Sequence, residues 1–174
     1  LKSYKKISNI NNLFILRNSI NSGPGESRNY GIEQSKGKYI TFLDSDDWLS
    51  SDYFEIIKPI LGNYDYDCII HEAIIKNEDG SEYIWKPFLA DLRSDELEKK
   101  NILVFSKGCP WAKIYKRSII RENNVKFLKL KRKEDFPFTK IAISLCNKFL
   151  YLQRPLYFYY QNANSLMHNK ALLD

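Results

Sequence analysis

The residues that stand out for their chemistry are three carboxylates within four positions, Asp44, Asp46 and Asp47 around Ser45. They directly follow the apolar run at 38–43, and in open α/β sheets ligands bind beyond the carboxyl ends of the strands. Carboxylates this close repel one another. A hard divalent cation relieves that repulsion and can bridge a phosphate-bearing substrate. The turn therefore predicts a site for Mg²⁺ or Mn²⁺, with an Asx turn that caps the next helix as the alternative.

An alternation of strands and helices is predicted to position this turn. Short apolar runs predict strands at 12–16, 38–43, 66–70 and 112–115, with turn residues at 21–25. Helices are predicted at 26–35, 52–61, 95–105, 117–123 and 135–146, a β-hairpin at 72–88, and extended segments at 151–152 and 156–160. The alternation in the first half favours a parallel sheet, while the second half is more mixed.

Composition limits the class of protein. Hydrophobic residues make up 44% of the 174 residues, enough for the core of one domain over 1–174. No apolar stretch approaches the ~20 residues that cross a bilayer. Cys68, Cys109 and Cys146 form no CxxC pair, which argues against a disulfide framework or a zinc site and favours a reducing, cytoplasmic setting. The net charge of +6 fits several anionic partners, and a solvated face best explains the basic run at 129–133.

Several segments, in order and at consistent spacing, resemble family 2 glycosyltransferases. The stretch NSGPGESRNYGI (21–32) is similar to N-x-G-x-x-x-A-R-N-x-G-I, and GKYITFLDSDDW (37–48) is similar to G-x-Y-I-x-F-L-D-S-D-D. Ser27 replaces the usual alanine. Later segments resemble the capsule- and lipopolysaccharide-type members: PWAKIYKR at 110–117, EDFPF at 134–138, and YFYYQ at 157–161 with SLM at 165–167. The resemblance covers most of the chain.

The resemblance implies an inverting transfer, which is a single displacement at the anomeric carbon. Such a reaction needs a base for the acceptor hydroxyl and stabilisation of the departing nucleoside diphosphate. It implies Asp135 as the catalytic base and Glu134 as a substrate-side helper. Helix-start acids, which the helix dipole favours, are the alternative for both.

The same resemblance assigns the donor side of the site. It places Asp44 and Asp46 at the metal and the diphosphate, and Asp47 near the donor sugar. Arg28 is expected to contact the donor, because a guanidinium pairs well with phosphate. For the substrate, the resemblance implies that Trp111 stacks on a sugar and Lys113 meets a phosphate. Core packing and a solvated lysine are the respective alternatives.

The implied fold is the α/β GT-A fold, a Rossmann-like mixed sheet flanked by helices. Residues 1–62 would form the donor- and metal-binding half and residues 63–174 the acceptor-binding half. The family's usual first strand and its D-D-G-S segment do not precede Leu1 in this sequence. We therefore expect an N-terminally truncated form of the fold, without segments that in the family hold much of the nucleotide.

The implied partners are a nucleotide-sugar donor, above all a UDP-sugar, and a glycan or lipid-linked acceptor. The expected class is EC 2.4, a hexosyl- or N-acetylhexosaminyl-transferase, at a cytoplasmic location with peripheral contact to the inner face of the plasma membrane left open. The alternative is a non-catalytic sugar-binding or assembly module that has lost the nucleotide site. No nucleic-acid partner is expected, because no recognised motif appears. His168 is expected at the surface rather than on a metal, and His71 is unassigned.

Overall fold

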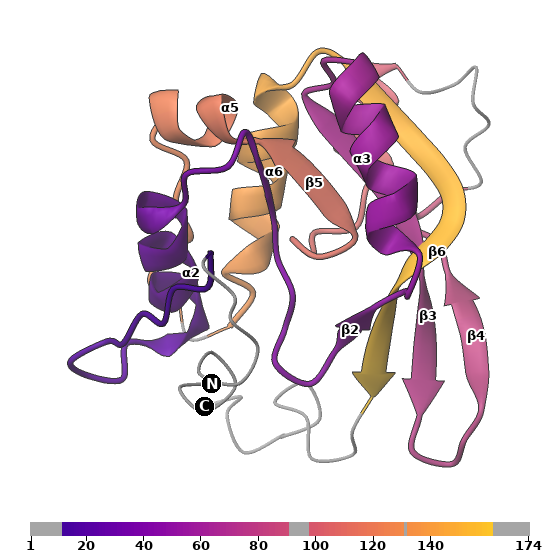
Figure 1. Cartoon of the computed structure of the whole chain (residues 1–174), viewed down its shortest axis with the longest axis horizontal. Helices are drawn as coiled ribbons and strands as arrows, with labels where there is room; N and C mark the ends of the chain where they lie inside the picture. The colour runs from indigo at the N-terminus through magenta and orange to yellow at the C-terminus, as the bar shows by residue number, and fades with distance from the viewer. Residues whose placement is uncertain (1–11, 91–97, 131, 162–174) are drawn as a thin grey trace.

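The computed structural model describes residues 12–90, 98–130 and 132–161, and a mixed six-stranded sheet runs through its centre (Figure 1). The strands are β1 (Tyr39–Thr41), β2 (Trp48–Leu49), β3 (Cys68–Asn77), β4 (Glu82–Trp85), β5 (Lys113–Lys116) and β6 (Phe149–Gln161). The described helices are α2 (Gly23–Gln34), α3 (Tyr53–Asn63), α4 (Lys99–Phe105), α5 (Arg117–Glu122) and α6 (Asp135–Leu145). None of the helices in these ranges is long and apolar enough to cross a membrane.

The sheet has the order β1-β5-β3-β6-β2, and β4 pairs with the second half of β3. Strand β6 runs parallel to β3, whereas β5 is antiparallel to both β1 and β3, and β2 is antiparallel to β6. The parallel sheet predicted for the first half is therefore wrong. Strand β5 comes from the second half of the chain and inserts between β1 and β3, which an alternation of elements along the sequence does not reveal.

Side chains of β3 alternate between two apolar layers, because successive residues of a strand face opposite sides. Cys68 and Ile70 point into a core completed by α2, α4, α5 and α6, while Ile69 points to the side covered by α3. In Figure 1, α2, α5 and α6 gather on one side of the sheet, and α3 lies in front of β6. The core residues of helix α3 are Tyr53 and Ile57. The helices therefore fix the sheet from both faces.

The apolar run at 12–16 is not a strand, contrary to the prediction. Residues 13–18 have no regular structure, and Phe14, Ile15 and Leu16 are exposed. A strand needs a neighbour for its backbone hydrogen bonds, and no strand of the described ranges pairs with this run. The turn predicted at 21–25 is instead the start of α2, which begins at Gly23 with Pro24 in its first turn, where a fixed φ is favourable.

Most other predicted elements are confirmed with changed limits. Helices α3, α5 and α6 match the predictions closely, and α4 starts at Lys99, with the earlier part of that prediction outside the described residues. The predicted strand at 66–70 and the first arm of the hairpin form one continuous strand, β3. The two late extended segments are likewise one strand, β6, because a register shift opposite His71 and Glu72 accommodates Pro155, which lacks a backbone N–H. His168 and the segment 165–167 lie outside the described residues.

Candidate active site

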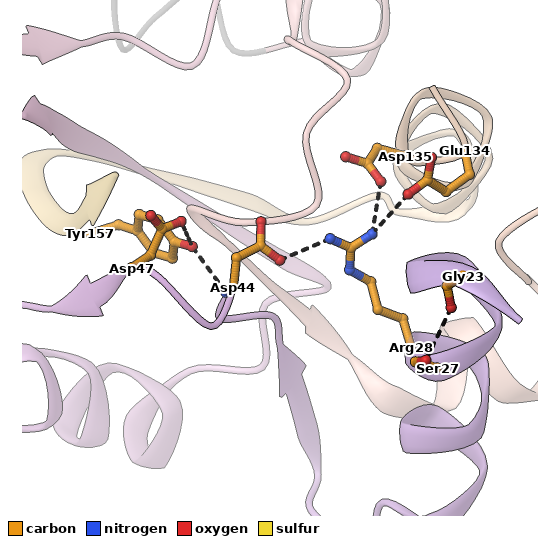
Figure 2. Close-up of polar contacts among 8 residues, drawn as sticks. All are labelled: Gly23, Ser27, Arg28, Asp44, Asp47, Glu134, Asp135 and Tyr157. Carbon is orange, nitrogen blue, oxygen red and sulfur yellow. Dashed lines mark hydrogen bonds and ion pairs between the residues drawn. The ribbon is translucent and has the colours of Figure 1, made fainter. Parts of the chain in front are cut away.

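The guanidinium of Arg28, on α2, joins the acidic turn to the start of α6 (Figure 2). Its Nη2 donates to Oδ1 of Asp44 at 2.8 Å, and its Nη1 donates to Oε1 of Glu134 at 3.2 Å and Oδ1 of Asp135 at 3.0 Å. The Arg28 side chain is only 17% exposed, so these ion pairs are shielded from water more than ordinary surface pairs are. We call Arg28, Asp44, Glu134 and Asp135 the Arg28 cluster.

Close packing of α2 against Phe127 and Glu134 holds the Arg28 cluster together. The side chain of Asn29 donates to the carbonyl of Phe127 at 2.9 Å and accepts the N–H of Phe127 at 2.8 Å. Gly25 permits the approach, because a Cβ at that position would lie 3.1 Å from Cγ of Glu134 and 3.2 Å from Cβ of Phe127. The motif that suggested a glycine-rich turn is therefore a helix that docks against the loop before α6.

The acidic turn is clamped by strand β6. The hydroxyl of Tyr157 accepts the N–H of Asp44 at 3.2 Å and donates to Oδ2 of Asp47 at 2.5 Å. The N–H of Tyr160 donates to Oδ1 of Asp47 at 2.9 Å. Burial raises the pKa of Asp47, and these hydrogen bonds oppose the shift. Both oxygens of Asp47 thus bind the protein itself. Sequence reasoning missed the role of Tyr157, although that residue opens the tyrosine-rich motif at 157–161.

Asp46 differs from its neighbours because it is exposed, and its carboxylate makes no hydrogen bond or ion pair with the described residues. In the described part of the chain, no group of three or more His, Cys, Asp or Glu side chains is arranged to hold a metal. Mg²⁺ commonly uses one or two carboxylates together with substrate phosphates. Asp46 and Asp44 are two carboxylates of that kind, and Asp44 is also paired with Arg28.

Asp135 has a raised pKa, and its burial is the main cause. Burial raises its pKa to about 6; the positive charge of Arg28 opposes the shift, while the negative charges of Glu134 and Asp44 add to it. The side chain is still 33% exposed, so its carboxyl group remains in contact with solvent. A carboxyl with a pKa close to neutral pH is suited to accept a proton in catalysis.

Trp111 and Lys113 are both buried. The Trp111 ring is 8% exposed and stacks on Tyr157 with centroids 5.1 Å apart, so it supports the residue that clamps the acidic turn. Lys113 is fully buried, and its ammonium donates to the carbonyls of Lys107 at 3.2 Å and Cys109 at 2.8 Å. In this conformation Lys113 holds the 107–109 loop and is not at the surface where a phosphate would bind.

The sequence is similar to one protein family and to individual proteins of known or proposed activity. The family model described as Glycosyl transferase family 2 matches residues 1–123. The chain is 28% identical over 178 residues to the putative glycosyltransferase EpsH of Bacillus subtilis, covering 98% of this chain and 52% of that protein. It is 26% identical to the poly(ribitol-phosphate) beta-N-acetylglucosaminyltransferase TarS of Staphylococcus aureus, covering 91% of this chain and 27% of that protein.

Solved structures agree on the fold. The crystal structure of residues 1–349 of S. aureus TarS matches with a TM-score of 0.74 and 25% identity, covering 91% of this chain and 47% of that one. The same TarS fragment in complex with UDP-GlcNAc matches with a TM-score of 0.77 and 24% identity, covering 97% of this chain and 48% of that one. The expected GT-A mixed sheet with flanking helices is confirmed. The chain spans about half, or less, of the length of these relatives.

Proposed function

This chain belongs to glycosyl transferase family 2, and we propose that it moves a sugar from a nucleoside-diphosphate donor to a surface-glycan acceptor, with inversion at the anomeric carbon. The observation that carries the proposal is the Arg28 cluster. One guanidinium holds Asp44, on the donor side, and Asp135, the proposed base, at 2.8 Å and 3.0 Å. A direct displacement needs the leaving group and the attacking hydroxyl close to one carbon, and this spacing suits that requirement.

Asp135 accepts the proton of the acceptor hydroxyl while the hydroxyl oxygen attacks the anomeric carbon. The new C–O bond forms while the bond to the diphosphate breaks, and the diphosphate leaves with the electron pair. Arg28 lies next to the base and supplies positive charge near the leaving group. Glu134 shares Arg28 with the base and helps to hold it in place.

Asp44 and Asp46 would hold a divalent cation, Mg²⁺ or Mn²⁺, through carboxylate oxygens. When bound, such a cation stabilises charge on the departing diphosphate. In this proposal Asp47 shapes the turn and lies near the donor sugar, and its two hydrogen-bonded oxygens keep the turn rigid. A sugar contact for Trp111 and a phosphate contact for Lys113 stay predictions. The latter requires the ammonium of Lys113 to leave two carbonyl oxygens.

The relatives support the choice of substrate class. A TarS structure holds UDP-GlcNAc, and the names of two relatives specify transfer of N-acetylglucosamine or glucose to poly(ribitol-phosphate). We therefore propose a UDP-hexose or UDP-N-acetylhexosamine as donor and a surface polymer or its lipid-linked precursor as acceptor. An acceptor of the latter kind would bring the protein to the inner face of the plasma membrane.

The decisive experiment screens the full-length protein with a panel of nucleotide sugars, with and without Mg²⁺ or Mn²⁺. Donor binding is followed by thermal shift and transfer by product formation. In Asp135→Asn we expect transfer to fall by roughly 10²-fold or more while donor binding survives. Glu134→Gln, which keeps the base, should lose far less. A chain that binds donor without any transfer would support the non-catalytic module, and wild-type transfer in Asp135→Asn would refute the assignment of the base.

A further inference from the structure

The loop that precedes α6 exposes two leucines among lysines. Leu128 and Leu130 are each 48% exposed, and the N–H of Leu130 donates to the carbonyl of Leu128 at 2.9 Å, so the chain folds back sharply at Lys129. Residues 125–133 carry basic side chains at five positions and no acidic side chain. The basic tip is defined as the exposed side chains Lys126, Leu128, Lys129, Leu130 and Lys133.

Buried residues anchor the chain next to the basic tip. Val125 and Phe127 are 4% and 2% exposed, so the residues just before the turn are anchored in the core. Asn29 bonds both the carbonyl and the N–H of Phe127. After the turn, Glu134 is 8% exposed and bound to Arg28. Phe127 and Glu134 are therefore held in place, and Leu128 follows directly on an anchored residue.

The composition of the tip selects one kind of partner. Two neighbouring leucines in water are unfavourable, and their burial in an apolar phase is favourable. Lysines beside them can lay their aliphatic stems on the same apolar phase while the ammonium groups stay at anionic headgroups. A nucleic acid would use the lysines and gain little from the leucines. Apolar side chains framed by lysines are typical of surfaces that lie in a lipid interface.

We propose that the basic tip docks on an anionic lipid surface. The lysines meet the headgroups, and Leu128 and Leu130 enter the boundary between headgroups and acyl chains. Because Lys133 is immediately followed by Glu134 and Asp135, docking brings the start of α6 close to the membrane. A role in presenting a lipid-linked acceptor to Asp135 rests on the proposed function; the lipid contact itself does not.

The test is co-sedimentation of the full-length protein with vesicles of phosphatidylcholine alone or mixed with phosphatidylglycerol. We expect binding to the mixed vesicles and little to the neutral ones. Leu128→Ser with Leu130→Ser, and separately Lys129→Gln with Lys133→Gln, should each lower the partition coefficient roughly tenfold. The matched control is Phe54→Ser with Lys58→Gln on α3, where Phe54 is 65% exposed, and it should bind like the wild type.

Three outcomes decide the matter. Loss of binding in both tip variants, with an unchanged thermal transition, supports the proposal. Binding to mixed vesicles that neither variant reduces overturns it. Loss of binding in the lysine variant alone points to a soluble polyanion as the partner and also overturns the proposal. In that case duplex DNA in solution would bind the leucine variant as well as it binds the wild type. Transfer to a soluble acceptor should be unchanged in the leucine variant, so failure of the lipid contact is distinguishable from failure of the proposed function.

Discussion

The phenolic oxygen of Tyr157 lies 2.5 Å from Oδ2 of Asp47, a residue 110 positions earlier in the chain, and accepts the N–H of Asp44 at 3.2 Å. One hydroxyl therefore connects both ends of the acidic turn. Burial, together with the hydrogen bond to Asp47, raises the pKa of Tyr157, so the hydroxyl keeps its proton and remains a donor. The geometry of the proposed diphosphate site thus depends on a strand at the far end of the sequence.

Tyr157→Phe removes this connection without removing the ring. We expect the free energy of unfolding to fall by about 1–2 kcal/mol, since the partly buried carboxylate of Asp47 loses one of its two donors. The donor KM should rise more than kcat falls, because the turn is loosened while the base is untouched. Steady-state kinetics and thermal unfolding measure both effects. The control is Tyr39→Phe, whose buried hydroxyl has no hydrogen-bond partner in the described part of the chain. Equal effects in the two variants would contradict the clamp.

Local chemistry was predictable from the sequence, and pairing between distant segments was not. The acidic turn follows β1, and Asp135 begins α6, because strand ends and helix starts have local signatures. That one guanidinium bridges Asp44 and Asp135 depends on how α2 and α6 pack. Lys113 shows the same limit: a lysine within an apolar strand reads as a surface cation, yet its ammonium binds carbonyl oxygens inside the fold. The exposed run at 12–16 has strand composition, but composition does not tell whether a partner strand is beside it.

The pH dependence of transfer should follow the base. Because the pKa of Asp135 is raised to about 6, chiefly by burial, its carboxylate persists only above that pH. The expected kcat/KM therefore falls as pH drops through about 6, rather than through the ordinary range near 4. Glu134→Gln removes a negative charge that raises the pKa of Asp135, so the acid limb should move to lower pH. An acid limb that does not move would show that another group controls it.

Arg28→Lys tests the bridge. A single ammonium cannot reproduce the two-sided contacts of the guanidinium with Asp44 and with Glu134 and Asp135. We expect the free energy of unfolding to drop by about 1–3 kcal/mol at pH 8, because partly buried carboxylates lose hydrogen bonds from a charged donor. A lysine keeps a positive charge, but its single ammonium lies less closely against Asp135 and opposes the raised pKa of that carboxyl less. The folded variant therefore takes up a proton at Asp135 more readily.

The deficit of Arg28→Lys should consequently shrink as pH falls from 8 to 5, and denaturant unfolding at several pH values measures it. Arg121→Lys, at an exposed position on α5, is the matched control and should show little change at any pH. A deficit that stays constant with pH would mean that Arg28 acts through packing on Phe127, whose ring centroid lies 5.4 Å from Cζ of Arg28, and not through its contacts with the carboxylates.

Asp46→Asn separates function from stability. The side chain is exposed and bonds to no described residue, so the free energy of unfolding should stay within about 0.5 kcal/mol of the wild-type value. Transfer should fall and require a higher concentration of Mg²⁺ or Mn²⁺, since a hard cation loses a carboxylate ligand. Chelation by EDTA should abolish wild-type transfer reversibly. Glu78→Gln, in the turn between β3 and β4, is the control, and full activity in EDTA would rule out the metal.

We expect alanine to have opposite effects on stability at two glycines of α2. Alanine is the better helix former by about 1 kcal/mol, and both Gly25 and Gly31 have ordinary negative φ. A Cβ on Gly31 meets nothing within 4 Å, so Gly31→Ala should stabilise the protein. A Cβ on Gly25 would lie 3.1 Å from Cγ of Glu134 and 3.2 Å from Cβ of Phe127.

These neighbours of Gly25 have little room to move, because Phe127 is 2% exposed and Glu134 is held by Arg28. Crowding should therefore outweigh helix propensity, and Gly25→Ala should destabilise the protein by about 1–2 kcal/mol. The added Cβ at position 25 should also displace Glu134 and Asp135 relative to Arg28. We therefore expect kcat to fall in Gly25→Ala and to stay unchanged in Gly31→Ala. Thermal unfolding and initial rates of the two variants, measured together, test this. If Gly25→Ala is as stable and as active as Gly31→Ala, α2 does not hold the base in position through this contact.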